Sequence, residues 1–240
     1  MMKVFLAALI VGGATILGGV IGFLIKRIPK RISELLLCLA SGIMLSAAVF
    51  SLVEPSVEDG GIITASFGVV LGTVFIGLCE RIVPNLHLAQ GSENKGELSG
   101  VVTFVFAIAI HNMPEGIAAG VSLGADDIST AISVVCGIAI QNIPESLVIV
   151  PPMLSVGVKP TKALSVVILT GSTEILGTFL GFFATEIFDM LMPLFLSFAG
   201  GAMLYVLCEE MIPRGREEGR LGAYVIMSGF VLMTVINEML

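Results

Sequence analysis

Long apolar segments follow one another along almost the whole chain, and they limit the folds that it can adopt. Eight of them are present, and each approaches the roughly 20 apolar residues that a helix needs to cross a bilayer. Only 13% of the 240 residues are charged, against about 25% in an average soluble domain. We therefore predict an all-α polytopic membrane protein that forms a single transmembrane domain over residues 1–240. The eight predicted transmembrane helices are residues 4–25, 32–53, 62–83, 100–123, 128–151, 162–183, 191–208 and 223–239.

The basic residues predict how these helices are oriented, because loops rich in Lys and Arg stay in the cytoplasm. Eleven of the 12 Lys and Arg residues fall on one side of the predicted membrane, and only Lys3 falls on the other. Both termini are therefore expected outside the cytoplasm, in an inner or plasma membrane, with residues 84–99 as a cytoplasmic loop. The outward connections carry acidic residues instead, which either concentrates cations at an entrance or reflects topology and solvation alone.

Two parts of the chain resemble each other at a constant shift of 159 residues. The segment Ile-Leu-Gly at residues 16–18 recurs at 175–177, and Met-Leu at 44–45 recurs at 203–204. Five predicted crossings separate the two copies, and because this number is odd the copies run through the membrane in opposite directions. The pattern predicts an inverted repeat in a 3+2+3 arrangement, in which helices 1–3 correspond to helices 6–8. Such repeats recur in secondary transporters.

Two similar hexapeptides lie in the two central apolar segments. They read His-Asn-Met-Pro-Glu-Gly at residues 111–116 and Gln-Asn-Ile-Pro-Glu-Ser at residues 141–146. Pro114 and Pro144 are expected to kink their helices, because proline removes a backbone donor and clashes with a carbonyl one turn earlier. A carboxylate at the bilayer centre costs about 2.5 to 3.5 kcal/mol on insertion scales, so the glutamate of each motif is a candidate for a functional site.

The polar residues of the two motifs form a candidate metal site. Residues three and four apart share a helix face, so these side chains point in similar directions, and Glu174 adds a third carboxylate at similar depth. No Lys or Arg is predicted at mid-membrane to balance them, so protons or a divalent cation must do so. One imidazole with carboxylate and amide oxygens suits Zn²⁺ and tolerates Fe²⁺, Mn²⁺, Co²⁺ or Cd²⁺. The candidate ligands are His111, Asn112, Glu115, Gln141, Asn142, Glu145 and Glu174.

Other interpretations of these residues stay open. The motifs can be two proline kinks with polar side chains that hold helices together, and Glu174 can be a protonated side chain bonded to a serine. Glu209 and Glu210 end the seventh predicted helix, where they form either an exit site or a solvated helix end. His87 in the cytoplasmic loop is either a further ligand of that exit site or a solvated loop residue.

The paired motifs and Glu174 resemble the ZIP family of divalent-metal transporters, in its prokaryotic form, and the likeness covers essentially the whole chain. The resemblance implies that Zn²⁺, often with other divalent ions, passes into the cytoplasm as a transported substrate. It also implies central helices that shift like an elevator against a scaffold that often dimerises. The implied centre has a first metal position at His111, Glu115, Gln141 and Glu145, and a second at Asn112, Glu115, Asn142, Glu145 and Glu174.

Three positions depart from the family pattern. Gln141 stands where many relatives have His, Asn142 stands where some have an acidic residue, and Ser146 replaces the usual glycine. The chain therefore brings fewer strong ligands and less negative charge to its centre than many relatives do.

A zinc or divalent-metal transporter is the principal hypothesis, with the lipid bilayer and a second copy of the chain as partners, no organic cofactor and no nucleic acid. An intramembrane metallohydrolase is an alternative, but zinc peptidases use more imidazoles than the two that His87 and His111 provide. A metal-binding sensor or structural membrane subunit is another, and the predicted inverted repeat argues against it.

Overall fold

The computed structural model describes residues 1–25, 27–82, 112–124, 128–155, 158–213 and 218–239. Within these ranges every regular element is a helix, which confirms the predicted all-α class. Residues 112–122 form a helix between α3 and α5 along the chain. The other elements are α1 (Met2–Ile25), α2 (Lys30–Ser46), η1 (Ala47–Val53), α3 (Glu54–Ile82), α5 (Ile128–Ser155), α6 (Pro160–Ile187), η3 (Asp189–Leu191), α7 (Met192–Val206), η4 (Leu207–Met211) and α9 (Gly219–Met239).

Six helical stretches of the described residues are long and apolar enough to cross a membrane. Five of them match the predicted helices at 4–25, 128–151, 162–183, 191–208 and 223–239, so the chain is a multi-pass membrane protein. Of the predicted helix at 100–123, the part up to residue 111 lies outside the described residues, and the rest is helical through 122.

The sixth stretch, Lys30–Cys79, is 50 residues long, and Gly61 interrupts it. At φ +77° and ψ 161° Gly61 adopts a conformation that only glycine reaches without strain, so helical geometry stops there. The stretch therefore holds both the predicted helix at 32–53 and most of the one at 62–83. The expected connection over 54–61 was wrong in extent, because α3 already begins at Glu54 and only Gly61 departs from helical geometry.

The helix α5 is continuous from Ile128 to Ser155 and includes Pro144. Pro114 lies close to the start of the described helix at 112–122. The kinks expected at these two prolines stay predictions.

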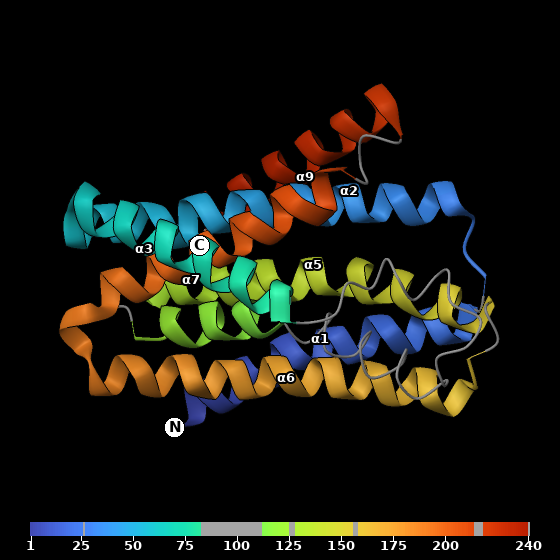
Figure 1. Cartoon of the computed structure of the whole chain (residues 1–240), viewed down its shortest axis with the longest axis horizontal. Coiled ribbons are helices and arrows are strands. Elements are labelled where there is room, and N and C mark those ends of the chain that lie inside the picture. The colour runs from blue at the N-terminus through green and yellow to red at the C-terminus, as the bar shows by residue number, and fades with distance from the viewer. Residues whose placement is uncertain (26, 83–111, 125–127, 156–157, 214–217, 240) are drawn as a thin grey trace.

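The helices pack in two groups that α5 joins. Helix α1 contacts α5 and α6, whereas α2 contacts α9 and α3 contacts α7. Figure 1 shows α6 and α1 along one side of the molecule, α2, α9 and α7 along the other, and α5 between them. The main apolar core contains buried side chains from both groups, among them Val11 on α1, Met44 on α2 and Met203 on α7, together with Ile138 on α5. The polar residues of α5 therefore lie inside the protein, where the two groups meet.

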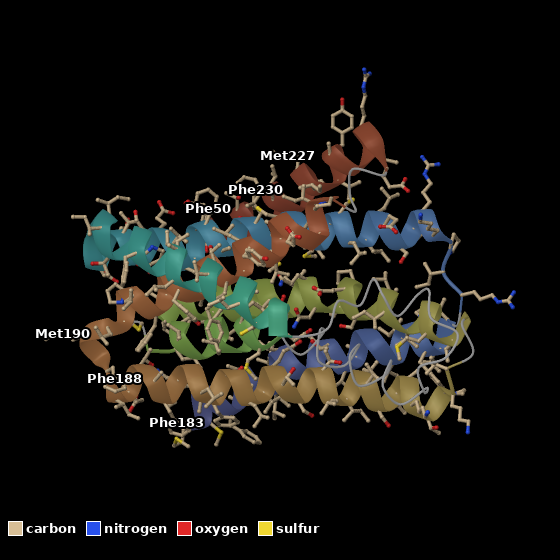
Figure 2. All side chains as sticks on the ribbon, viewed as in Figure 1. Phe50, Phe183, Phe188, Met190, Met227 and Phe230 are labelled. Carbon is tan, nitrogen blue, oxygen red and sulfur yellow. The ribbon has the colours of Figure 1, made fainter. Side chains whose placement is uncertain are left out.

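The outer surface of the helices is apolar. Figure 2 shows Phe183, Phe188, Met190 and Met227 pointing away from the helix bundle, and each of these side chains is at least 44% exposed. A surface of this kind suits contact with lipid rather than with water. It agrees with the assignment as a membrane protein.

Glycines allow α1 and α6 to approach at one crossing point. A methyl group added to Gly12 would lie 2.4 Å from the carbonyl oxygen of Gly171, and one added to Gly171 would lie 2.6 Å from that of Gly12. The two residues are separated by the 159-residue shift found in the sequence. The contact is therefore reciprocal, and it places corresponding segments of the two repeats against each other.

The packing of α1 on α5 resembles the packing of α6 on the helix at 112–122. Gly18 on α1 lies against the carbonyl oxygen of Ile143, and Gly177 on α6 lies against that of Met113. The two glycines differ by 159 residues and their partners by 30, which are the two shifts of the sequence repeats. Pairs of small residues at such contacts let helices approach closely within a membrane.

Replacing Gly12 by Ala should destabilise the protein by about 1 to 3 kcal/mol, because the added methyl group overlaps the α6 backbone. The matched control is Gly13→Ala on the next residue of the same helix, where an added methyl group meets nothing within 4 Å. Thermal unfolding in detergent should show a lower Tm for the first variant and an unchanged or slightly higher Tm for the second. Equal Tm values for the two variants would contradict the close crossing.

Candidate metal centre

The carboxylate of Glu174 is the centre of a buried polar cluster. Its residue is 0% exposed, and it lies midway along α6. The hydroxyl of Thr15 on α1 lies 2.6 Å from Oε1 and 2.7 Å from Oε2 of this carboxylate, so it donates to the pair of oxygens. Both carboxylate oxygens are thus engaged by a side chain from another helix.

Two asparagines from the sequence motifs complete this cluster. The Nδ2 of Asn142 on α5 donates to Oε2 of Glu174 over 2.9 Å and lies 3.0 Å from the Thr15 hydroxyl oxygen, to which it also donates. The Nδ2 of Asn112 donates to Oε1 of the same carboxylate. Four helices, α1, α5, α6 and the one at 112–122, therefore meet at one acidic side chain. A buried carboxylate needs such donors, because burial removes its hydration.

A second polar pair joins the two motifs. The Nε2 of Gln141 donates to Oε1 of Glu115 over 2.8 Å, and the two residues are 0% and 3% exposed. Buried oxygens in this region that have no hydrogen-bond partner among the described residues include Glu115 Oε2, Gln141 Oε1 and Asn142 Oδ1. A buried acceptor without a donor costs free energy, and a bound cation is one way to remove that cost.

The three glutamates form one electrostatic cluster. Glu145, partly buried on α5, and Glu174 both lie close enough to Glu115 to repel its carboxylate when all are ionised. Lys3 and Lys162 lie at the ends of α1 and α6, and residues 4–25, 112–124, 128–155 and 163–187 contain neither Lys nor Arg. When its carboxylates are ionised, such a cluster attracts cations.

The structure brings together most of the predicted ligands but does not arrange them around one point. Among the described residues, no three His, Cys, Asp or Glu side chains are positioned to hold a single ion. The reason lies in the hydrogen bonds, because Glu174 is turned toward Thr15 and the asparagines while Glu115 is turned toward Gln141. His111 lies outside the described residues, so the full ligand set stays a prediction.

The predicted exit site is only partly described. Glu209 is exposed on η4, a short π-helix that continues α7, whereas the side chain of Glu210 and all of His87 lie outside the described parts. At a shift of 159 residues η4 corresponds to the π-helix η1, so the same irregular turn occurs in both repeats. Such turns are often found at functional sites.

Thr15 is the site residue that sequence reasoning missed. A threonine within an apolar segment carries no motif, and it resembles an ordinary packing residue. The signal was nevertheless present, because the 159-residue shift aligns Thr15 with Glu174. Thr15 and Glu174, which are hydrogen-bonded to each other, are therefore corresponding positions in the sequence repeat.

Comparison with known proteins identifies the family. The model of the family described as ZIP zinc transporter matches residues 87–237, and the chain is 34% identical to the zinc transporter GufA of Myxococcus xanthus over 96% of each protein. The chain belongs to the ZIP family. It is also 31% identical to the zinc transporter ZupT of Clostridium perfringens, over 98% of this chain and 94% of that protein. It is 29% identical to the zinc transporter ZIPB of Bordetella bronchiseptica, over 95% of this chain and 78% of that protein.

Membership of the ZIP family decides between the classes of function considered from the sequence. The relatives are named as zinc transporters and cover nearly the full length of this chain. A ZIP protein is a transporter and not an enzyme, so the metallohydrolase alternative loses its support.

Replacing Thr15 by Val should lower the free energy of unfolding by about 1 to 3 kcal/mol, because it leaves Glu174 buried with fewer donors. Thr15→Ser keeps the hydroxyl group and should retain most of the stability. Thermal unfolding of both variants in detergent, without added metal, measures the difference. A valine variant as stable as the original would show that the hydroxyl group contributes nothing to holding the carboxylate.

Proposed function

We propose that this ZIP protein transports Zn²⁺ into the cytoplasm through a site at the middle of the membrane, formed by the helix at 112–122 together with α5 and α6. The observation that supports this most directly is the set of buried oxygens without donors, next to three carboxylates and with no Lys or Arg in residues 4–25, 112–124, 128–155 and 163–187. A divalent cation fits these oxygens chemically, and its passage explains why such costly groups lie within lipid.

The ion is held chiefly by the residues of the first predicted position. Glu115 and Glu145 supply negative charge from the two central helices, and Gln141 supplies an amide oxygen. His111 supplies an imidazole nitrogen, a preferred ligand of Zn²⁺. Asn112, Asn142 and Glu174 complete the polar surroundings of the ion.

We propose the 3+2+3 inverted repeat of eight transmembrane helices, in one domain over residues 1–240, as the framework for transport. The reciprocal contacts of Gly12 with Gly171, and the matching contacts of Gly18 and Gly177, support this arrangement. With eight crossings and basic loops in the cytoplasm, both termini face outward. A homodimer in the cell membrane is proposed with it, on the family resemblance alone.

The ligand chemistry suggests a wider range of ions than zinc. Nitrogen and oxygen ligands without thiolates bind Fe²⁺, Mn²⁺, Co²⁺ and Cd²⁺ as well, and geometry and availability decide among them. We propose that these ions compete with Zn²⁺ for the same site. Weak and exchangeable binding suits a carrier, because an ion that is held too tightly cannot leave.

Uptake of Zn²⁺ into proteoliposomes should fall by at least about tenfold in Glu115→Gln and in Glu145→Gln, because each variant removes one charge from the ion. Loss of residues that merely support metal ligands already costs about 10- to 100-fold. The control is Glu238→Gln, which neutralises an exposed carboxylate at the end of α9 and should leave uptake unchanged. Normal uptake by both variants, in protein shown to be folded by its elution profile, would reject the proposed site.

A further inference from the structure

We propose that the centre of this protein carries one divalent ion at a time, because the hydrogen-bonded cluster of Thr15, Asn112, Asn142 and Glu174 takes the place of a second ion. The inference rests on the proposed transport function and specifies its stoichiometry. The family resemblance implies a second metal position formed in part by Asn112, Asn142 and Glu174. In this chain both asparagines already donate hydrogen bonds to Glu174.

The hydrogen bonds of Glu174 indicate that this carboxylate orients its neighbours and is not itself a metal ligand. Thr15 and Asn112 donate to Oε1, while Thr15 and Asn142 donate to Oε2. Both asparagines present their amide nitrogen to this carboxylate, and a nitrogen that donates cannot bind a cation. To form a second metal position, both amides would have to rotate and the hydroxyl would have to give up its contacts.

The hydrogen bonds of the Asn142 amide nitrogen also fix the position of its side-chain oxygen. Because the Nδ2 of Asn142 is held by Glu174 and by Thr15, its Oδ1 is left without a donor. The unpaired oxygens of Glu115 and Gln141 belong to the other polar pair, close to Glu145. Glu174 and Thr15 thus act as positioning residues that orient an amide, and the oxygens left without donors are the ones available to a single ion.

The charges of the cluster give an independent reason to expect one bound ion and not two. Glu115, Glu145 and Glu174 bring three negative charges, and the parts of the surrounding helices at residues 4–25, 112–124, 128–155 and 163–187 hold no Lys or Arg. One divalent ion leaves a single negative charge, which Glu174 keeps and three neighbouring side chains stabilise with hydrogen bonds. Two ions would leave a net positive charge with no anion beside it, and any protonated carboxylate would increase that excess. An unpaired buried charge is strongly unfavourable.

The residue at position 142 decides this balance. An acidic side chain there would raise the negative charge to four, which two divalent ions neutralise. It would also face Glu174 as a like charge, so that a metal ion or a shared proton would be needed between the two carboxylates. Asn142 instead offers a donor to Glu174 over 2.9 Å. We infer that the amide at this position replaces the second ion.

Counting bound ions in purified protein tests the proposal. The full chain in detergent is dialysed to equilibrium against Cd²⁺ or Zn²⁺, and metal per chain is measured by mass spectrometry. The double variant Glu115→Gln, Glu145→Gln defines binding elsewhere on the surface, and its value is subtracted. We expect one ion for the unaltered chain and two for Asn142→Asp. Crystals soaked in Cd²⁺ should show the same numbers as anomalous peaks beside Glu115.

Two further variants separate the effect of the added negative charge from the effect of removing the amide group. Asn112→Asp adds the same charge from the other central helix and should also raise the count to two, which provides a second test if Asn142→Asp does not fold. Asn142→Ser removes the amide without adding charge and should stay at one ion.

Two ions at the centre of the unaltered chain, with Zn²⁺ uptake intact, would overturn the single-ion proposal and leave transport standing. A count of one in both aspartate variants, folded and active, would overturn the charge rule on which the proposal depends. No ion at the centre together with no uptake would overturn the proposed function itself.

Discussion

The hydrogen bonds to Glu174 hold the centre of this protein together. A carboxylate that is 0% exposed has no water to solvate it, so its donors must come from the protein, and they come from three other helices. The close crossing of α1 and α6 at Gly12 and Gly171 brings Thr15 within reach, since it lies one turn beyond Gly12 on α1. Small residues at the helix crossing and polar residues at the site are therefore parts of one arrangement.

Most of the fold followed from the sequence, because the thickness of a bilayer sets the length of each apolar helix. The prediction was less exact between residues 54 and 61, where a connection was expected and helix was found up to Gly61. Polar residues in that segment suggested a loop, but acidic side chains such as Glu54 are also favourable in the first turn of a helix. Only the positive φ angle of Gly61 locates the break in the helix. Glycine allows many φ angles, so this one could not be predicted from the sequence.

The site was predictable where a motif marked it and not elsewhere. Asn112, Glu115, Gln141 and Asn142 lie together as their spacing suggested. Thr15 was missed because a threonine in an apolar helix usually bonds to its own backbone, as Thr178 does with the carbonyl of Glu174 one turn earlier. Which asparagine atom faces Glu174 also depends on neighbours from other helices, and no local pattern contains that information.

The proposed inverted repeat explains why the centre holds an odd number of carboxylates, three. Corresponding positions carry the same residue at Asn112 and Asn142 and at Glu115 and Glu145, so these pairs contribute equally from both central helices. At the outer pair the repeat is broken, because α6 supplies a glutamate at 174 and α1 supplies a hydroxyl at the equivalent place. Two like carboxylates there would repel each other within a low-dielectric interior, whereas a carboxylate and a hydroxyl attract. In the proposed repeat the backbone supplies two equivalent places, and unlike side chains make their close contact stable.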